Sequence, residues 1–446
     1  MADGMLTIDH LSTAVDRGEI DTVVVAMTDM QGRLQGKRCD ARYFLSEVAT
    51  QGTEACNYLL AVDVEMTTVD GYAMSSWERG YGDFLLRPDF ATLRRIPWQP
   101  GTALILCDLE WLDGSPVVAS PRQILRAQID RLAAHGLTAF AGTELEFIAF
   151  EDTYEAARHA GYRGLTATNQ YNVDYSILGT SRIEPLLRKI RTSMAGSGMT
   201  VESAKGECND GQHEIAFRYK DALTTCDNHS IFKTGAKEIA AQQGQSLTFM
   251  AKFNEREGNS CHIHMSMRRG AESAFAGFTD TMRAFLAGQL ACARDFTLMY
   301  APNINSYKRF AKGSFAPTAV AWGVDNRTCA FRVVGHGDAL RVENRIPGGD
   351  VNPYLSVATM IAAGLHGIEN GLTLEEETLG NAYQADKTHV PSTLREAAQL
   401  FGASAAARAA FGEDVVNHYL NMARVEVEAF DATVTDWERM RGFERL

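Results

Sequence analysis

Five carboxylates and one histidine, drawn from four separated segments, are the residues in this sequence whose types most clearly suggest chemistry. They are Glu144, Glu146, Glu207, Glu214, His262 and Glu343. So many like charges facing one cavity would repel one another strongly unless divalent cations neutralised them. Five carboxylates with one imidazole favour the hard cations Mg²⁺ or Mn²⁺ over Zn²⁺. The joint pattern therefore predicts a metal centre.

Smaller groups of these residues carry a weaker signal. Glu144 and Glu146 lie in an apolar run, residues 137–150, in which alternation with period two would put both carboxylates on one face of a strand. Glu207 and Glu214 alone fit a solvated hairpin equally well. His262 alone fits a buried core histidine better than a ligand. Only the combined set favours a metal site.

The elements that must position these residues change in kind along the chain. The first 112 residues are rich in strands, with a short helix over 6–17, strands over 22–27 and 102–108, and a hairpin around 29–37. Beyond them, long helices alternate with strands near residues 200 and 246. Helices are expected over 121–135, 183–197, 226–243, 280–301 and 353–371, followed by a run of helices over 394–439. Two domains are predicted, residues 1–112 and 113–446.

Bulk properties exclude several other classes of function. The 446 residues are 45% hydrophobic, enough for one or two substantial cores, and the net charge of −13 argues against nucleic acid as a partner. The chain lacks an apolar run of about 18 residues, so no membrane partner is expected. Eight cysteines without a Cys-x-x-Cys pair, and no secretory signal at the start, predict a cytoplasmic protein with free thiols.

The order and content of these segments resemble the glutamine synthetase family, the type I bacterial form in particular. Further matching segments extend the resemblance over nearly the whole chain: 69–71, 86–89, 305–309, 326–332 and 434–439. The resemblance implies an α+β fold, with a small N-terminal β-grasp-like domain and a large C-terminal catalytic α/β domain containing an antiparallel sheet. It also implies a homo-oligomer, a dodecamer of two stacked hexamers, whose active sites lie between subunits.

Residue roles follow from the resemblance, position by position. Glu146, Glu207 and Glu214 would hold one metal ion, and Glu144, His262 and Glu343 a second, so two or more Mg²⁺ or Mn²⁺ ions are expected per site. ATP would contact Glu202, His264, Ser266, Arg332 and Arg341, and glutamate would contact Gly258, Arg309 and Arg345. Asp70, Tyr171, Phe315 and Arg327 match positions near the reacting groups. Asp338 replaces a family lysine, and neither a P-loop nor a Gly-x-Gly-x-x-Gly fingerprint is present.

One segment differs from the family pattern at the position expected to bind the second substrate. Glutamine synthetases carry a Gly-Tyr-Glu-Ala-Pro flap whose glutamate, with an aspartate from the neighbouring subunit, forms the ammonium site. Here the segment reads Gly313-Ser314-Phe315-Ala316-Pro317. A phenyl ring cannot pair with ammonium through charge, but it offers an apolar wall to an alkyl group. Asp70 still matches the neighbouring aspartate and could accept a proton from an amine.

The sequence is therefore most similar to the glutamate–amine ligases, the γ-glutamylamide synthetases of this family. The predicted reaction joins the γ-carboxylate of L-glutamate to a small primary amine through γ-glutamyl phosphate, with ATP as the phosphoryl donor. Methylamine, ethanolamine, other alkylamines, polyamines and anilines all stay open as acceptors. Two alternatives are a true glutamine synthetase using ammonia and a catalytically inactive relative with a structural or binding role. Tyr383 lies near a position that some relatives adenylylate, but its surroundings differ and no such modification is expected.

Overall fold

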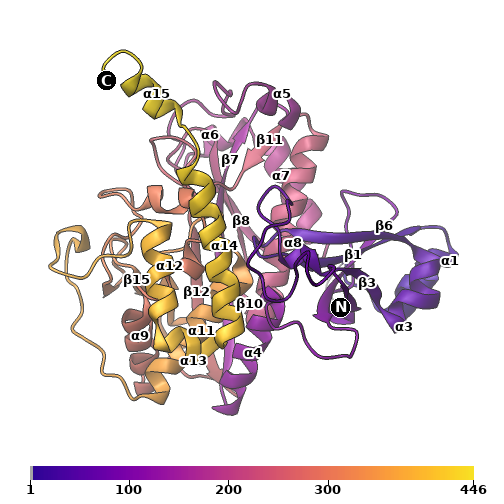
Figure 1. Ribbon diagram of the computed structural model, residues 1–446, viewed down its shortest axis with the longest axis horizontal. Coiled ribbons are helices and arrows are strands. Elements are labelled where there is room, and N and C mark those ends of the chain that lie inside the picture. The colour runs from indigo at the N-terminus through magenta and orange to yellow at the C-terminus, as the bar shows by residue number, and fades with distance from the viewer. Residues whose placement is uncertain (1–3) are drawn as a thin grey trace.

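Two sheets, each built from its own stretch of sequence, organise the computed structural model, which describes residues 4–446. The first sheet has the order β2-β1-β6-β4-β3, with β5 on β6. Its strands are β1 (Thr22–Thr28), β2 (Leu34–Asp40), β3 (Thr53–Cys56), β4 (Asp83–Pro88), β5 (Arg94–Arg95) and β6 (Thr102–Glu110). β1 pairs antiparallel with β2, as the predicted hairpin requires, and parallel with β6. This sheet and α1 form a lobe that projects from the main body (Figure 1).

The second sheet carries the candidate metal ligands and runs in the order β14-β15-β16-β12-β7-β9-β8. Its strands on this path are β7 (Thr138–Phe150), β8 (Val201–Gly206), β9 (Gln212–Phe217), β12 (Cys261–Arg269), β14 (Trp322–Val324), β15 (Phe331–Val334) and β16 (Arg341–Asn344). Short strands β10 (Lys220–Asp221), β11 (Ser246–Thr248) and β13 (Glu272–Ser273) pair at its margins. The pairing is antiparallel as predicted, except that β14 and β15 run parallel.

Helices cover one face of the large sheet and form the C-terminal layer (Figure 1). The α-helices are α1 (Ile8–Asp16), α2 (Ala41–Tyr43), α3 (Ala49–Gln51), α4 (Pro121–Ala134), α5 (Tyr154–His159), α6 (Ile177–Ser181), α7 (Glu184–Ala195), α8 (Ala222–Gln242), α9 (Asp280–Cys292), α10 (Thr297–Tyr300), α11 (Pro353–Glu369), α12 (Leu394–Ala403), α13 (Ala405–Phe411), α14 (Glu413–Asp431) and α15 (Asp436–Gly442). None of the helices formed by residues 4–446 combines the length and apolar character needed to cross a lipid bilayer.

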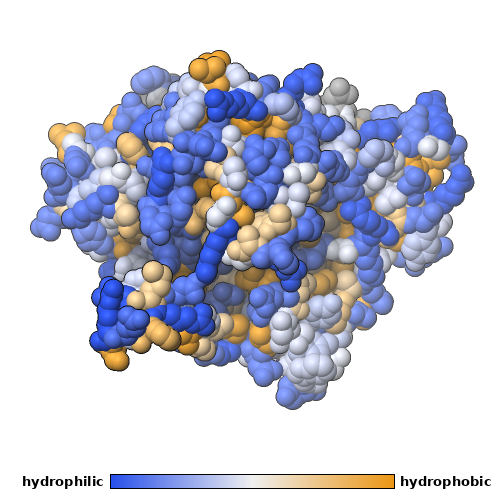
Figure 2. Space-filling view, turned by 90° about the horizontal axis from the view of Figure 1, so that it is seen from above, coloured by the Kyte–Doolittle hydropathy of each residue, from blue (hydrophilic) through white to orange (hydrophobic). Residues whose placement is uncertain are grey.

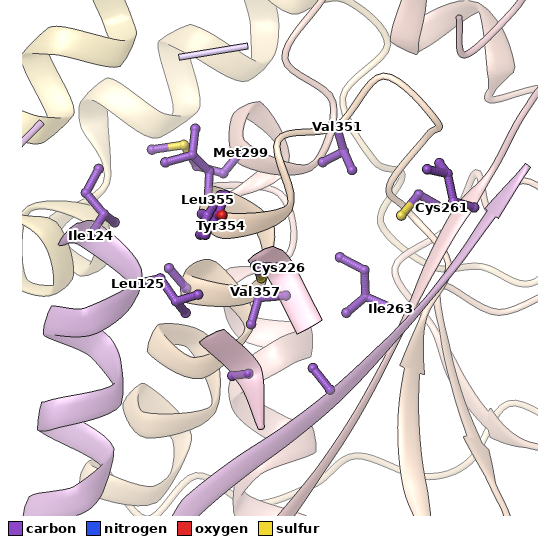
Figure 3. Packing of buried hydrophobic residues seen from close by; sticks show 14 of the residues in the cluster. Ile124, Leu125, Cys226, Cys261, Ile263, Met299, Val351, Tyr354, Leu355 and Val357 are labelled. Carbon is purple, nitrogen blue, oxygen red and sulfur yellow. The ribbon is translucent and has the colours of Figure 1, made fainter. Parts of the chain in front are cut away.

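The main core lies between the large sheet and these helices. Along β12, Cys261 and Ile263 are fully buried and face the apolar side chains of α4, α8 and α11 (Figure 3). Strand side chains alternate between faces, so His262 and His264 project from the opposite face of β12. Burial of the odd-numbered residues therefore determines which side of the sheet carries the site. On the outside, apolar residues occur in scattered groups on a largely hydrophilic face (Figure 2).

One predicted helix is interrupted. The sequence pattern predicts a continuous helix over 280–301, but α9 ends at Cys292 and α10 begins at Thr297. The intervening turn brings buried Phe296 against Phe411 of α13, with ring centroids 5.8 Å apart, so tertiary packing outweighs local helix propensity. The helices expected over 394–439 are present as α12 to α15. The domain boundary after residue 112 falls in the segment between β6 and α4 and stays a prediction.

A buried arginine connects the small sheet to helices α4 and α8. Arg122 of α4 is 2% exposed and donates from Nε and Nη2 to the carboxylate of Asp227 in α8, both at 3.0 Å. Its Nη1 and Nη2 donate to Asp108 of β6 and to Asp89, both at 2.6 Å. The guanidinium thus donates to three carboxylates, two from the N-terminal part of the chain and one from α8. A buried charge that loses its partner is strongly destabilising.

Arg122→Met is therefore expected to lower the free energy of unfolding by about 3–5 kcal/mol, since Asp227 would stay buried without its cation. Arg126→Met is the matched control, because Arg126 binds the same Asp89 and Asp108 but is far more exposed. Its loss should cost about 1 kcal/mol or less. Urea denaturation of both variants measures the difference. Equal midpoints for the two variants would contradict the central role of Arg122.

Candidate active site

The first predicted cluster forms across three adjacent strands. Glu146 of β7 and Glu214 of β9 are direct cross-strand partners, and Glu207 immediately follows β8. One carboxylate oxygen from each of Glu146, Glu207 and Glu214 lies within 4.8 Å of the other two. Gly211 and its neighbours turn the chain so that β8 and β9 form a hairpin, with the Glu207 N–H donating to the Gln212 carbonyl at 2.9 Å. Hairpin geometry therefore brings Glu207 back to Glu214.

The second predicted cluster lies beside the first. His262 of β12 stands opposite Glu144 of β7, and Glu343 comes from β16, the neighbour of β12 on its other side. The Nδ1 atom of His262 lies 3.4 Å from Oε1 of Glu343 and 3.6 Å from Oε2 of Glu144. The two-residue spacing of Glu144 and Glu146 places one carboxylate in each cluster. The structure thus brings together both predicted ligand sets.

The electrostatics of these clusters suit a divalent cation. Burial, and then the charge of Glu207, raise the pKa of Glu146 to about 8. Burial, and then the charge of Glu144, raise the pKa of Glu214 well above its usual value. A cation would relieve this repulsion. Burial and the charge of Arg345 lower the pKa of His262 to about 4, so its imidazole is neutral at pH 7 and has a lone pair available to a metal.

Glu343 has protein partners as well. It is 1% exposed, its Oε2 accepts from Nη1 of Arg332 at 2.9 Å, and its Oε1 accepts from Nη1 of Arg345. Each carboxylate oxygen has two lone pairs, so a metal can share both oxygens with these arginines. Arg332 lies opposite Glu343 in the β15–β16 ladder. The pair of arginines fixes the orientation of Glu343 before any ligand binds.

A cavity of about 400 Å³ adjoins the second cluster and is lined by four of the five residues predicted to contact ATP. They are Glu202, His264, Ser266 and Arg341, together with Glu144. His264 accepts from Nε of Arg341 at 3.1 Å through Nδ1, and its Nε2 lies 2.9 Å from Glu144. A β-bulge at Glu202 interrupts the β8–β9 ladder, and bulges redirect side chains. The fifth residue, Arg332, pairs with Glu343 and Asp325 instead.

The residues predicted to bind the substrate glutamate lie next to one another, but the terminal nitrogens of Arg309 already donate to the protein backbone. A Cβ at Gly258 would come 2.3 Å from the Ala251 carbonyl oxygen and 2.8 Å from Cγ of Arg309, so only glycine fits there. Arg309 is 1% exposed, and its Nη1 and Nη2 donate at 2.8 Å to the carbonyls of Ile346 and Arg345. In this conformation Arg309 shapes the backbone around Arg345. Gripping a carboxylate with both terminal nitrogens would require it to release these carbonyls.

The remaining predicted residues are not brought together within residues 4–446. Phe315 is 58% exposed, and its carbonyl accepts from Nη2 of Arg345 at 3.3 Å. Asp70 is exposed beside α14, where its carbonyl accepts from Asn421 at 3.0 Å. Arg327 is exposed on the turn between β14 and β15, and Tyr171 is 44% exposed in the loop between α5 and α6. Their predicted roles near the reacting groups remain untested.

Lys205 is a site residue that the sequence reasoning missed. It faces Glu214 in the β8–β9 ladder, so its ammonium joins the row formed by Glu214 and Glu146. Its Nζ contacts Glu207, and it lies 4.9 Å from the ring centroid of Tyr175. Its position in the strand that leads to Glu207 is the feature of the sequence that could have identified it as a site residue. Lys205 gives the first cluster a cation of its own.

Lys205→Met is expected to tighten Mn²⁺ binding at the first cluster by about ten-fold, because the variant removes a positive charge that competes with the metal. Calorimetric titration of the protein with Mn²⁺ measures this. Lys189→Met, on the exposed side of α7, provides a control that should leave the affinity unchanged. Unchanged or weaker binding in the Lys205 variant would contradict the competition.

Comparisons with known proteins agree with this geometry. The family model "Glutamine synthetase, catalytic domain" matches residues 118–441, a range that contains both clusters. The gamma-glutamylethanolamide synthetase GlnA4 of Streptomyces coelicolor is 68% identical over 445 residues, covering 99% of this chain and 96% of that protein. A glutamate–isopropylamine ligase from a Pseudomonas species is 38% identical over 439 residues, with 96% of each chain covered. A solved GmaS/ADP complex aligns over 100% of both chains with a TM-score of 0.85 and 26% identity.

Proposed function

Because this chain belongs to the glutamine synthetase family, and within it is an ATP-dependent glutamate–amine ligase, we propose that its acceptor amine is ethanolamine. The product would be γ-glutamylethanolamide. The observation that carries this choice is the 68% identity, over almost the whole chain, to a protein named for that product. Phe315 supports an organic amine over ammonium, since a phenyl ring supplies no charge for a small cation.

The proposed reaction has two steps. A γ-carboxylate oxygen of glutamate attacks the γ-phosphorus of ATP, and the bond to the β–γ bridging oxygen breaks, releasing ADP. The amine nitrogen then attacks the acyl carbon of γ-glutamyl phosphate, the C–O bond to phosphate breaks, and the nitrogen loses a proton. Asp70 from a neighbouring subunit is the proposed acceptor of that proton. Bound Mg²⁺ or Mn²⁺ ions, two or more per site, would neutralise charge on the phosphoryl oxygens.

The positions of the side chains suggest which residues would bind the nucleotide, the transferring phosphate and glutamate. Arg341 and His264 line the nucleotide cavity, next to the second cluster. Guanidinium groups match phosphate geometry, so Arg332 and Arg327 are proposed for the transferring phosphate. Gly258, Arg309 and Arg345 are proposed for glutamate, and Arg345 also donates to Glu343 of the second cluster. In this proposal the γ-carboxylate of glutamate and the γ-phosphate of ATP would meet between the two clusters.

An amine panel tests the proposal. ATP, L-glutamate and Mg²⁺ are supplied with ammonium, methylamine, ethanolamine, isopropylamine or putrescine, and the amide product is identified by mass spectrometry. Ethanolamine should give the highest kcat/KM. Activity with ammonium alone would indicate a glutamine synthetase. Absence of turnover with every amine would indicate a catalytically inactive relative.

A ring-shaped oligomer, a dodecamer of two stacked hexamers, is part of the proposal. Asp70 lies beside α14 of its own chain, so a neighbouring copy is the proposed source of the Asp70 that reaches each site. The helix α15 also exposes Trp437 and Met440, and the chain continues with exposed Phe443 and Leu446, an apolar surface suited to contacts between copies. Native mass spectrometry should give the dodecamer mass. A fully active monomer or dimer would contradict the shared site.

A further inference from the structure

A later segment, residues 378–390, lies beside the residues that come directly after the flap (residues 313–317), and we call this segment the strap. Backbone hydrogen bonds join the two: the Val320 N–H donates to the Thr388 carbonyl at 2.8 Å, and the Val390 N–H donates to the Thr318 carbonyl at 3.0 Å. Further along, the Thr378 N–H donates to the Trp322 carbonyl at 2.9 Å. The strap is therefore in register with the segment that follows the flap.

Tyr383 is the strap residue that reaches the flap itself. It lies in a short 3₁₀ helix (Ala382–Gln384), whose first turn is capped by the side chain of Asn381. The half-buried phenol of Tyr383 donates a hydrogen bond to the Ala316 carbonyl at 2.9 Å. Burial raises the pKa of Tyr383, so the hydroxyl keeps its proton and stays a donor at neutral pH.

The flap backbone needs such a contact at Phe315. Its φ of +57° lies in the left-handed region, where a residue with a bulky side chain is an outlier. Such conformations persist only where surrounding contacts hold them. Two contacts do so here, on consecutive carbonyls: Arg345 donates to that of Phe315 and Tyr383 to that of Ala316. One comes from the predicted glutamate site and the other from the strap.

We propose that Tyr383 is a positioning residue for amine selection: its hydroxyl holds the flap in the conformation that places Phe315 at the acceptor site. The proposal rests on the proposed function, because it requires Phe315 to contact the acceptor amine. Tyr383 does not touch the reacting atoms. Its loss should affect the amine step and leave ATP binding alone, since none of the residues lining the nucleotide cavity belongs to the flap or the strap.

Tyr383→Phe removes only the hydroxyl. The KM for ethanolamine is expected to rise by about three- to ten-fold, the range that corresponds to one lost hydrogen bond, while the KM for ATP stays unchanged. A loosened flap also admits water, so more γ-glutamyl phosphate should be hydrolysed and the ratio of phosphate released to amide formed should rise above one. Initial rates and product counts measure both effects.

Tyr154→Phe is the matched control. Tyr154 is also half-buried, and its hydroxyl donates to a backbone carbonyl, that of Leu247, at 3.0 Å, but on α5. This hydroxyl also accepts from the Leu247 N–H at 3.2 Å, so the variant loses at least as much hydrogen bonding as Tyr383→Phe, but away from the flap. It should leave the amine KM and the phosphate-to-amide ratio at the values of the unmodified enzyme.

A double-mutant cycle tests whether Tyr383 acts through the backbone of Phe315. Glycine adopts positive φ without strain, so in a Phe315→Gly background the flap no longer needs Tyr383 to hold that conformation. Tyr383→Phe should then have no further effect on the amine KM. An equal effect of Tyr383→Phe in both backgrounds would overturn the mechanism.

The outcomes separate the two proposals. If the unmodified enzyme forms no γ-glutamylamide from any amine, the proposed function fails. If it does form one, but Tyr383→Phe has the amine KM and the phosphate-to-amide ratio of the unmodified enzyme, then the proposed role of Tyr383 is wrong and the proposed function still stands. A variant in which kcat falls equally for all substrates, together with a lower melting temperature, would assign Tyr383 a merely structural role and also overturn the proposal.

Discussion

Phe315→Glu is expected to raise the selectivity for ammonium over ethanolamine, as the ratio of their kcat/KM values, by about ten-fold or more. A carboxylate at this position would pair with ammonium, and pairing in a partly buried site is worth roughly 1–3 kcal/mol. The same carboxylate would penalise the carbon chain of ethanolamine, which would meet a desolvated charge instead of a ring. The backbone should tolerate the change, because Arg345 and Tyr383 bind main-chain carbonyls and not the ring.

Phe315→Gln is the matched control for this switch. It has the shape of glutamate without the charge, so it should weaken the use of ethanolamine without gaining ammonium activity to the same extent. Michaelis constants for ATP and glutamate should change little in both variants, because Arg345 and both clusters are untouched. If the selectivity ratio of Phe315→Glu does not move, Phe315 is not a selectivity element.

Glu146→Gln is expected to lower kcat/KM by about a hundred-fold or more, through loss of a metal at the first cluster. The substitution suits the site sterically. Oε2 of Glu146 accepts from the Ser260 N–H at 2.7 Å and from the side-chain amide of Gln212 at 3.1 Å, and a glutamine carbonyl oxygen can accept both. Its NH₂ group would then replace the other carboxylate oxygen and repel a cation. The fold should survive while the metal affinity falls.

Two measurements separate this effect from unfolding. Calorimetric titration should show weaker Mn²⁺ binding in Glu146→Gln, and adding Mg²⁺ should raise its melting temperature less than that of the unmodified protein. Glu155→Gln, an exposed change on α5, should behave like the unmodified protein in both. Full Mn²⁺ affinity in the Glu146 variant would remove Glu146 from the ligand set.

The sequence predicted much of the fold and the content of the clusters. The α+β fold and the antiparallel character of the large sheet were implied by the family resemblance, whereas the hairpin after β1 and the C-terminal helices follow from patterns within single segments. The shared face of Glu144 and Glu146 follows from strand geometry, which does not depend on distant residues. The hairpin, the helices and the alternation along a strand are local features, so a linear sequence contains them.

The tertiary structure decided those features of the site that depend on which strands lie next to each other. Lys205 joins the first cluster only because β8 pairs with β9 in a register that puts it opposite Glu214. Arg309 donates to two backbone carbonyls, because burial leaves its nitrogens no water to bond, and its predicted contact with glutamate stays a proposal. The predicted helix over 280–301 breaks to pack Phe296. Ladder register and burial are properties of the assembled chain, and no single segment specifies them.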